Sequence, residues 1–312
     1  MQAEFIIIGA GMTGLSCARR LVDAGRSVVV LDKGRGIGGR LATRRTDFGS
    51  FDHGAQYVAP KTDGFATALA SMAADGAGAT WTLDGRDVYV GTPGMNALAK
   101  HLSSGIQVRQ QALVTGLAQT AGGWQVQLSD ECLSPDCVVM TVPAPQAIDL
   151  LGVGNPIADQ ISAVSMVPSL TLMAAFQTDD APRFVTRRDS DDDLAWIALN
   201  SSKPGRIGEA CWVAQASVAW SIAHLEHPKE ALDELMLPML CQRIGLAPDA
   251  ATYAAGHRWR YAMADRPLGQ AFIRSQDSAL YVGGDWCLGA RVEDAWTSGV
   301  SIADDILANR TV

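Results

Sequence analysis

The stretch Phe5-Ile-Ile-Ile-Gly-Ala-Gly-Met-Thr-Gly14 decides the fold of this 312-residue chain. Its apolar residues predict a buried β-strand, and the three glycines have the spacing of the GxGxxG motif that joins such a strand to a helix. Gly9 permits the tight turn, Gly11 lets a pyrophosphate approach the backbone, and Gly14 allows close packing of helix on strand. Amide groups at the helix start then face the pyrophosphate charge. The stretch therefore predicts a Rossmann-type unit that binds a dinucleotide.

The next strand, Ser27-Val-Val-Val-Leu31, leads directly into an acidic residue, Asp32. An acidic side chain at the end of the second strand of such a unit accepts hydrogen bonds from ribose hydroxyls. Gly36-Ile-Gly-Gly-Arg40 follows where a plain NAD dehydrogenase would continue into its next helix. This segment resembles the second FAD fingerprint of flavoproteins of the monoamine oxidase and protoporphyrinogen oxidase class. In that class the arginine adds a charge-assisted contact to the pyrophosphate.

Two later segments complete the resemblance to this flavoprotein class. Asp52-His-Gly-Ala-Gln-Tyr57 is similar to the segment that runs past the isoalloxazine ring. Tyr281-Val-Gly-Gly-Asp285 is similar to the strand whose final aspartate binds the ribitol chain. A helix starting near Asp294 would direct its N-terminus at the flavin, where its dipole favours the negative charge that grows on reduction. The resemblance therefore implies FAD.

Six longer segments resemble the bacterial renalase family, and together they span nearly the whole chain. They are Lys33–Arg40, His53–Tyr57, Gly91–Met95, Asn200–Pro204, His257–Ala262 and Gly284–Glu293. The resemblance implies a p-hydroxybenzoate-hydroxylase-like fold of class α/β, with a Rossmann-type FAD-binding domain and a discontinuous α+β substrate domain. It also implies non-covalent FAD and oxidation of the 2- or 6-dihydro isomers of NAD(P)H. In that reaction hydride passes to flavin N5 and the electrons pass to O2, which gives NAD(P)+ and H2O2.

The site residues follow from these motifs and from the resemblance. We expect FAD contacts from Gly9, Gly11, Met12, Thr13, Gly14, Asp32, Lys33, Gly39, Arg40, Ala55, Gln56, Val114, Asp285 and Val292. We expect substrate contacts from His53, Tyr57, Asn200, Lys203, His257, Trp259 and Trp286. The histidines and tryptophans also suit core positions, and Asn200 and Lys203 also suit an exposed turn before Pro204. We expect no metal and no catalytic acid, base or nucleophile, because hydride loss from a dihydronicotinamide yields an aromatic cation directly.

The pattern of elements predicts two domains that interrupt one another. We expect residues 1–58, 93–150 and 276–312 to bind FAD, and residues 59–92 and 151–275 to form the substrate domain. Within them the sequence predicts antiparallel strands over 106–128 turned at Gly122-Gly123, and a buried strand over 137–142. It also predicts strands near 169–177, 209–217 and 279–284 and a helix near 228–244. The charged run Arg187–Asp193 is interpreted as a solvated loop.

Composition and charge exclude several classes of protein. The net charge of −8 disfavours binding to nucleic acid or to an anionic membrane. No apolar run approaches the about 18 residues of a membrane span. Residues 1–4 carry no basic segment, so we expect no secretion signal. The six cysteines show no CxxC spacing, which favours reduced thiols and a cytoplasmic location.

Two other functions remain open from the sequence. A flavin amine oxidase acting on a small amine or polyamine is one alternative, and that class tends to place a lysine beside flavin N5. Lys203 would serve there, whereas with a dihydronicotinamide it would bind phosphate or ribose. A non-catalytic FAD-binding protein is the other alternative. Reduction of the flavin by a small substrate would exclude it.

Overall fold

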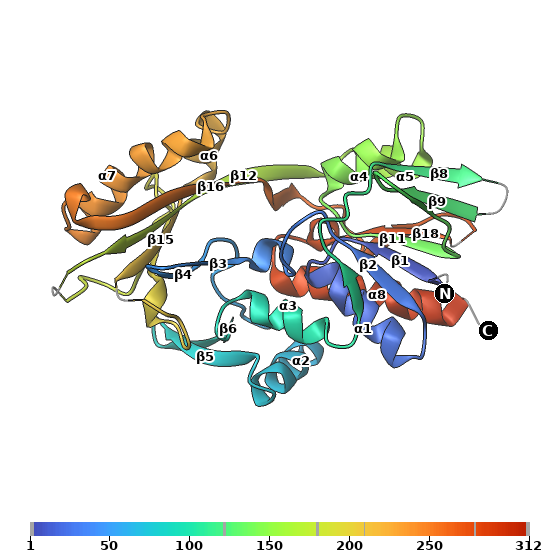
Figure 1. Ribbon diagram of the computed structural model, residues 1–312, viewed down its shortest axis with the longest axis horizontal. Helices are drawn as coiled ribbons and strands as arrows, with labels where there is room; N and C mark the ends of the chain where they lie inside the picture. The colour runs from blue at the N-terminus through green and yellow to red at the C-terminus, as the bar shows by residue number, and fades with distance from the viewer. Residues whose placement is uncertain (1–2, 121–122, 179–180, 209, 278, 310–312) are drawn as a thin grey trace.

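The computed structural model describes residues 3–120, 123–178, 181–208, 210–277 and 279–309. A six-stranded sheet and a five-stranded sheet lie toward opposite ends of the long axis, and the long strands β12 and β16 extend from one toward the other (Figure 1). No helix within the described ranges has the length and apolar character that a bilayer crossing requires.

The six-stranded sheet has the order β17-β18-β11-β1-β2-β7. Its strands are β1 (Phe5–Ile8), β2 (Val28–Leu31), β7 (Gln107–Arg109), β11 (Cys137–Met140), β17 (Phe272–Arg274) and β18 (Leu280–Gly283). All neighbours pair in parallel except β17, which pairs with β18 in the antiparallel sense. The central strands are buried on both faces, which explains their continuous runs of Val and Ile.

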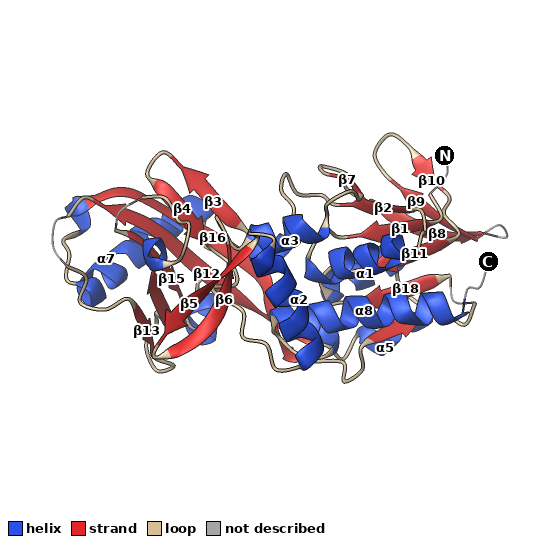
Figure 2. Cartoon of the chain, turned by 90° about the horizontal axis from the view of Figure 1, so that it is seen from below, coloured by secondary structure: helices blue, strands red, loops and turns tan. Residues whose placement is uncertain are grey.

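Two layers cover this sheet. On one side lie the helices α1 (Met12–Asp23) and α8 (Val292–Asn309), which run side by side (Figure 2). They approach closely, since a Cβ atom at Gly299 would lie 2.2 Å from the carbonyl oxygen of Thr13. Side chains of the other face pack against a small sheet and two helices. These are β8 (Gly116–Thr120), β9 (Gly123–Gln127), β10 (Cys132–Leu133), α4 (Ala144–Leu151) and α5 (Pro156–Ile161).

The five-stranded sheet is antiparallel, in the order β13-β14-β15-β12-β16. Its strands are β12 (Ser165–Phe176), β13 (Thr186–Arg188), β14 (Trp196–Leu199), β15 (Cys211–Gln215) and β16 (Ala251–Arg266). Leu170, Leu172 and Ala174, which alternate along β12, pack against α7 (Leu232–Ile244). Met173 and Ala175 point to the opposite face and contact Phe51. This alternation is that of a strand buried on both faces.

Two hairpins and two helices lie between the two sheets. They are β3 (Thr43–Thr46)/β4 (Gly49–Asp52), β5 (Gly78–Leu83)/β6 (Arg86–Gly91), α2 (Asp63–Ala74) and α3 (Asn96–Leu102). The helix α6 (Val218–Ala223) packs on the five-stranded sheet. Apolar side chains of α2, α3, β5 and β6 share one hydrophobic cluster with α1 and β1. This cluster fixes the hairpin β5–β6 beside the six-stranded sheet, whereas Phe51 of β4 packs against the five-stranded sheet.

The fold class expected from the sequence is confirmed, while two local predictions are wrong. Residues 107–109 form a strand of the parallel sheet and not an antiparallel pair, because they extend its edge beside β2. The predicted antiparallel hairpin is β8 and β9, and Gly122 of its predicted turn lies outside the described residues. The charged run is not entirely loop, since Arg187 and Arg188 belong to β13 and pair with β14. The domain limits given above stay a proposal.

Candidate functional site

A cavity of about 1580 Å³ is lined by residues of both large sheets and of the segments between them. Its walls run from the glycine turn after β1 to Ser169 of β12, Trp196 of β14 and Trp259 of β16. Ordinary small-molecule sites have volumes of about 300–1,000 Å³. The cavity therefore has room for a dinucleotide and a second ligand.

The glycine turn forms a cradle at one end of the cavity. Gly9 has a φ of +113°, a conformation that L side chains rarely adopt. A Cβ atom at Gly14 would lie 2.0 Å from the carbonyl oxygen of Gly9, so this glycine packs the helix on the strand and does not line the cavity. A Cβ atom at Gly11 would meet no protein atom within 4 Å, because this position borders the cavity. The cradle thus leaves space where a pyrophosphate would approach the backbone.

The Asp32 carboxylate is fixed at the end of β2. Its Oδ2 accepts a hydrogen bond from the amide of Ala10, and its Oδ1 accepts one from the amide of Gly34, both at 2.7 Å. Each oxygen of a carboxylate can accept a further hydrogen bond. Because Asp32 also lines the cavity, its position suits acceptance from ribose hydroxyls.

Arg40 and Asp285, which lie in separate motifs of the sequence, contact one another in the cavity wall. The Arg40 guanidinium donates to both Asp285 oxygens, at 2.7 and 2.8 Å, and also to the carbonyl oxygen of Ala262. The amide of Ala55 donates to the carbonyl oxygen of Arg40 at 2.8 Å. A bidentate ion pair therefore holds together the two residues that are predicted to contact pyrophosphate and ribitol.

Helix α8 begins at the cavity two residues before the predicted start, at Val292. The next residue, Glu293, is buried and accepts hydrogen bonds from the amides of Lys61 and Thr62 at 2.9 and 2.8 Å. A carboxylate in the first turn also complements the helix dipole. These bonds tie the segment before α2 to the start of α8.

Two neutral histidines and a tryptophan line the cavity on the side of β16. The rings of His53 and His257 are 4.5 Å apart between centroids, and His53 stacks on Trp259 at 5.3 Å. The Trp259 indole donates to the carbonyl oxygen of His53 at 2.7 Å. Burial, with the neighbouring His257 second, lowers the pKa of His53 to about 3, and burial lowers the pKa of His257 to about 4. Both imidazoles are therefore uncharged near neutral pH.

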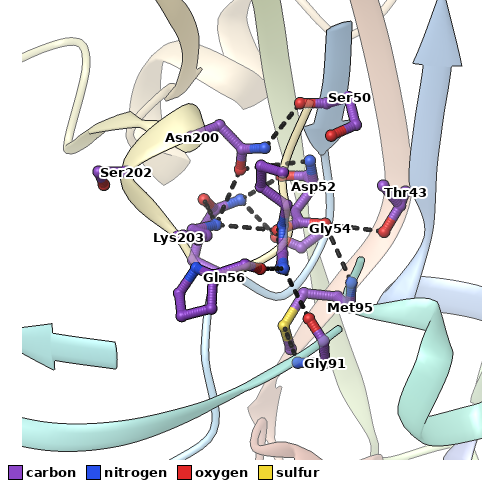
Figure 3. A network of polar contacts seen from close by, with 12 residues as sticks. Thr43, Ser50, Asp52, Gly54, Gln56, Gly91, Met95, Asn200, Ser202 and Lys203 are labelled. Atoms are coloured by element: carbon purple, nitrogen blue, oxygen red, sulfur yellow. Dashed lines mark hydrogen bonds and ion pairs between the residues drawn. The ribbon is translucent and has the colours of Figure 1, made fainter. Parts of the chain in front are cut away.

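Behind this wall lies a buried charged network centred on Asp52 (Figure 3). Its carboxylate accepts from Lys203 Nζ at 3.2 Å and from Arg206 Nη2 at 2.6 Å, and all three side chains are fully buried. Lys203 also donates to Gln56 at 3.0 Å and to Asn200 at 2.9 Å. Burial lowers the pKa of Lys203 to about 8, against the opposing attraction of Asp52. The network holds two cations and one anion.

The structure brings most of the predicted residues to the cavity. The predicted FAD contacts line it with the exception of Gly14, as do His53, Tyr57, His257 and Trp259. Asn200, Lys203 and Trp286 do not line it, so their expected substrate contacts need correction. Lys203 and Asn200 bond within the network behind the wall, and neither is an exposed turn residue. Trp286 is fully buried and donates to the carbonyl oxygen of Val142.

Sequence reasoning missed several residues of the site. Arg188 and Trp196 line the cavity, although the first lies in a charged run for which the sequence predicts a loop. Alternation within Thr186–Arg188 is too short a signal to reveal a strand. Arg206 completes the buried network, and its position directly after Lys203-Pro-Gly was the available signal.

The part of the cavity wall formed by residues 169–263 has an unusual charge. It includes three arginines, Arg188, Arg258 and Arg260, and no aspartate or glutamate among the described residues. The protein as a whole has a net charge of −8. Cationic walls in an acidic protein concentrate anionic ligands at that site.

Comparisons with known proteins agree with the fold. The family described as "Flavin containing amine oxidoreductase" matches residues 76–307, and an NAD(P)-binding Rossmann-like domain matches residues 7–71. The putrescine oxidase of Kocuria rosea is 37% identical over 60 residues, which are 19% of this chain and 13% of that protein. Among solved structures, a wild-type putrescine oxidase bound to putrescine gives a TM-score of 0.74 at 15% identity, covering 99% of this chain and 100% of that one. Cyclohexylamine oxidase from Brevibacterium oxydans gives 0.72 at 12% identity, covering 98% and 99%.

The Rossmann-type sheet, the glycine cradle and the cavity beside it are those of a dinucleotide-binding protein. Because the match extends over most of its length, the chain belongs to the flavin-containing amine oxidoreductase family. FAD is its cofactor, and the residues present fit it. The open space at Gly11 would accommodate the pyrophosphate, and Asp32, which lines the cavity, would accept hydrogen bonds from ribose. Among the described residues no three His, Cys, Asp or Glu side chains gather as a metal site would require.

Proposed function

We propose that this protein oxidises the 2- or 6-dihydro isomers of NAD(P)H to NAD(P)+ and passes the electrons to O2, which yields H2O2. The observation that carries the proposal is the charge of the cavity wall. Residues 169–263 contribute three arginines and no described carboxylate to it, and of the three only Arg260 is paired with a carboxylate, that of Glu226 outside the lining. A dinucleotide carries at least two negative charges at neutral pH, so this wall attracts it. The resemblance to bacterial renalases supports the same substrate class.

The chemistry required of the chain is modest. Bound FAD supplies a two-electron acceptor, and a dihydronicotinamide that loses hydride becomes an aromatic cation without proton transfer. The protein then needs to orient the ring and hold the phosphates. His53 and His257 suit this task, because they are neutral and have ring nitrogens without partners among the described residues. They provide hydrogen bonds without a competing charge.

The alternative is oxidation of a small amine or polyamine. Family membership and the short match to putrescine oxidase favour it. An aliphatic amine is a cation at neutral pH, and lysine-like ammonium groups have a pKa near 10.4. The arginines repel such a substrate, and Lys203 lies behind the wall instead of in the cavity. Amine oxidation is therefore the second candidate function.

Anaerobic mixing tests the proposal directly. The purified holoprotein is mixed with NADH, with its 2- and 6-dihydro isomers, and with putrescine and other amines, and the loss of flavin absorbance is followed. We expect rapid bleaching with at least one dihydro isomer and none with the amines. Bleaching by an amine alone would establish the alternative. A flavin that no compound reduces would support a non-catalytic FAD-binding protein.

We also retain as proposals the FAD contacts predicted from the sequence and the non-covalent attachment of FAD. Thirteen of the fourteen predicted contacts line the cavity. Cys287, which follows Asp285 by two residues, is fully buried, and burial raises the pKa of its thiol to about 12. A protonated, inaccessible thiol is a poor nucleophile for attachment to a flavin.

A further inference from the structure

The three arginines of the cavity wall differ in what their guanidinium groups already bind. Arg260 forms a bidentate ion pair with Glu226, at 2.6 and 2.9 Å. Arg258 donates through Nη1 to the carbonyl oxygens of Leu225 and His227. Arg188 has no carboxylate partner among the described residues. Of the three, Arg188 alone has neither a carboxylate partner nor a backbone acceptor among the described residues, so its charge and most of its donors are left for a ligand.

Arg188 is nevertheless held in a defined orientation. Its Nη2 donates to the hydroxyl of Tyr57 at 2.6 Å. Its guanidinium carbon lies 5.3 Å from the ring centroid of Trp196, a cation–π contact. Trp196 is 8% exposed, and its indole Nε1–H is buried without an acceptor among the described residues. The remaining donors of the guanidinium have no described protein acceptor.

Arg188 lies next to the segment that is expected to run past the isoalloxazine ring, because it contacts Tyr57 of that segment. Tyr57 directly follows Gln56 in the segment that resembles the one running past the isoalloxazine, and both line the cavity. Arg188 itself is exposed, at the rim. A ligand whose ring reaches the flavin would therefore extend its next groups toward Arg188.

We propose that Arg188, Tyr57 and Trp196 form a subsite that binds the phosphate next to the nicotinamide ribose of the substrate. The planar guanidinium fork matches two phosphate oxygens, and the tyrosine and the indole hold it in place. The inference rests on the proposed function, since it assigns the phosphate of that substrate class. Under this proposal Arg188 gives the site its preference for a nucleotide over the corresponding nucleoside.

Equilibrium binding tests the subsite without turnover. NAD+, nicotinamide mononucleotide and nicotinamide riboside are titrated into oxidised holoprotein, and the flavin absorbance change gives each Kd. A hydrogen bond to a charged group contributes about 1.5–3 kcal/mol, which is roughly 10- to 150-fold in affinity. Because Arg188 is exposed, we expect Arg188→Met to weaken binding of NAD+ and of the mononucleotide about 10-fold. Binding of the riboside should not change, and Arg188→Lys should restore part of the affinity.

Arg187→Met is the matched control. Arg187 precedes Arg188 on the same strand, but it pairs with Asp189 and Asp192 and does not line the cavity. Both variants change the net charge equally, so only a local contact separates them. Equal Kd values for NAD+ in wild type and Arg188→Met, or an equal loss for the riboside, would overturn the subsite while dihydronicotinamide oxidation stands. A wild type that binds neither NAD+ nor the mononucleotide would overturn both.

Discussion

Replacing Asp52 by asparagine should destabilise the protein by about 3–5 kcal/mol, the range for removing one partner of a buried ion pair. Asp52, Lys203 and Arg206 are each fully buried. Among the described residues no other carboxylate contacts either cation. Asparagine has nearly the same shape, but it is uncharged, and its NH2 group faces donors in either orientation: the two cations or the amide of Met95. Total stabilities of about 5–15 kcal/mol make this a large fraction of the whole.

Lys203→Met should destabilise the protein less than Asp52→Asn. It leaves the Asp52–Arg206 pair intact and removes the excess positive charge. What is lost is the donor to the oxygens of Gln56 and Asn200, at about 1–3 kcal/mol for a buried acceptor left without a partner. The order of the two variants therefore tests the charge balance of the network independently of either magnitude.

Urea unfolding measures both effects. The FAD concentration is kept in the same excess for every variant, because ligand binding shifts the apparent stability. Circular dichroism and flavin fluorescence are followed together, since coincident transitions are required for a two-state free energy. Asp304→Asn is the matched control, because the Arg20–Asp304 pair is about half exposed. We expect it to change the free energy of unfolding by about 0–1 kcal/mol.

Two results would refute this reasoning. One is an Asp52→Asn variant within about 1 kcal/mol of wild type at an unchanged denaturant slope, a loss no larger than that of an exposed pair. The other is a larger loss for Lys203→Met than for Asp52→Asn. Either would mean that Asp52 does not hold the two buried cations against their mutual repulsion.

Three further predictions concern the cradle, the cofactor and the buried lysine. Gly11→Ala places a methyl group in open cavity space, so the variant should fold normally but purify with little FAD. In Gly14→Ala the added methyl group meets the carbonyl oxygen of Gly9, so this variant should give less folded protein. A Gly11→Ala variant that purifies with a full complement of FAD would contradict the role of the glycine turn. Denaturation and filtration should release all flavin from wild type, and Asp32→Ala should weaken FAD binding roughly 5- to 150-fold by fluorescence titration. The folded pKa of Lys203 is about 8 and its ordinary value is 10.5, so between these values unfolding takes up a proton and the free energy of unfolding should rise with pH. Lys203→Met should remove that rise in unfolding experiments across this range, and an identical pH dependence would show that another group is responsible.

The cofactor end of the molecule was predictable because its determinants are contiguous. A strand, a GxGxxG turn and a helix encode their own backbone conformation, and Gly9 needs its positive φ whatever the rest of the chain does. Asp32 follows the second strand directly, so its place beside the turn results from the pairing of β1 with β2. These local constraints also explain why the Rossmann-type sheet was predictable from apolar runs.

The cavity wall around Arg188 and the buried network behind the wall were not predictable, because they are formed by residues that are far apart in the sequence. Arg188 meets Tyr57 across 131 positions of sequence, and Lys203 meets Asp52 across 151. Nothing in Asn200–Pro204 distinguishes a buried lysine from one in an exposed turn, because burial is a property of the surrounding layers. The sequence alone determined the Rossmann-type unit, the FAD cofactor and the motifs that line the cavity beside it. Only the packing of the five-stranded sheet against the hairpin β3–β4 decided which charges face the cavity and which lie buried behind its wall.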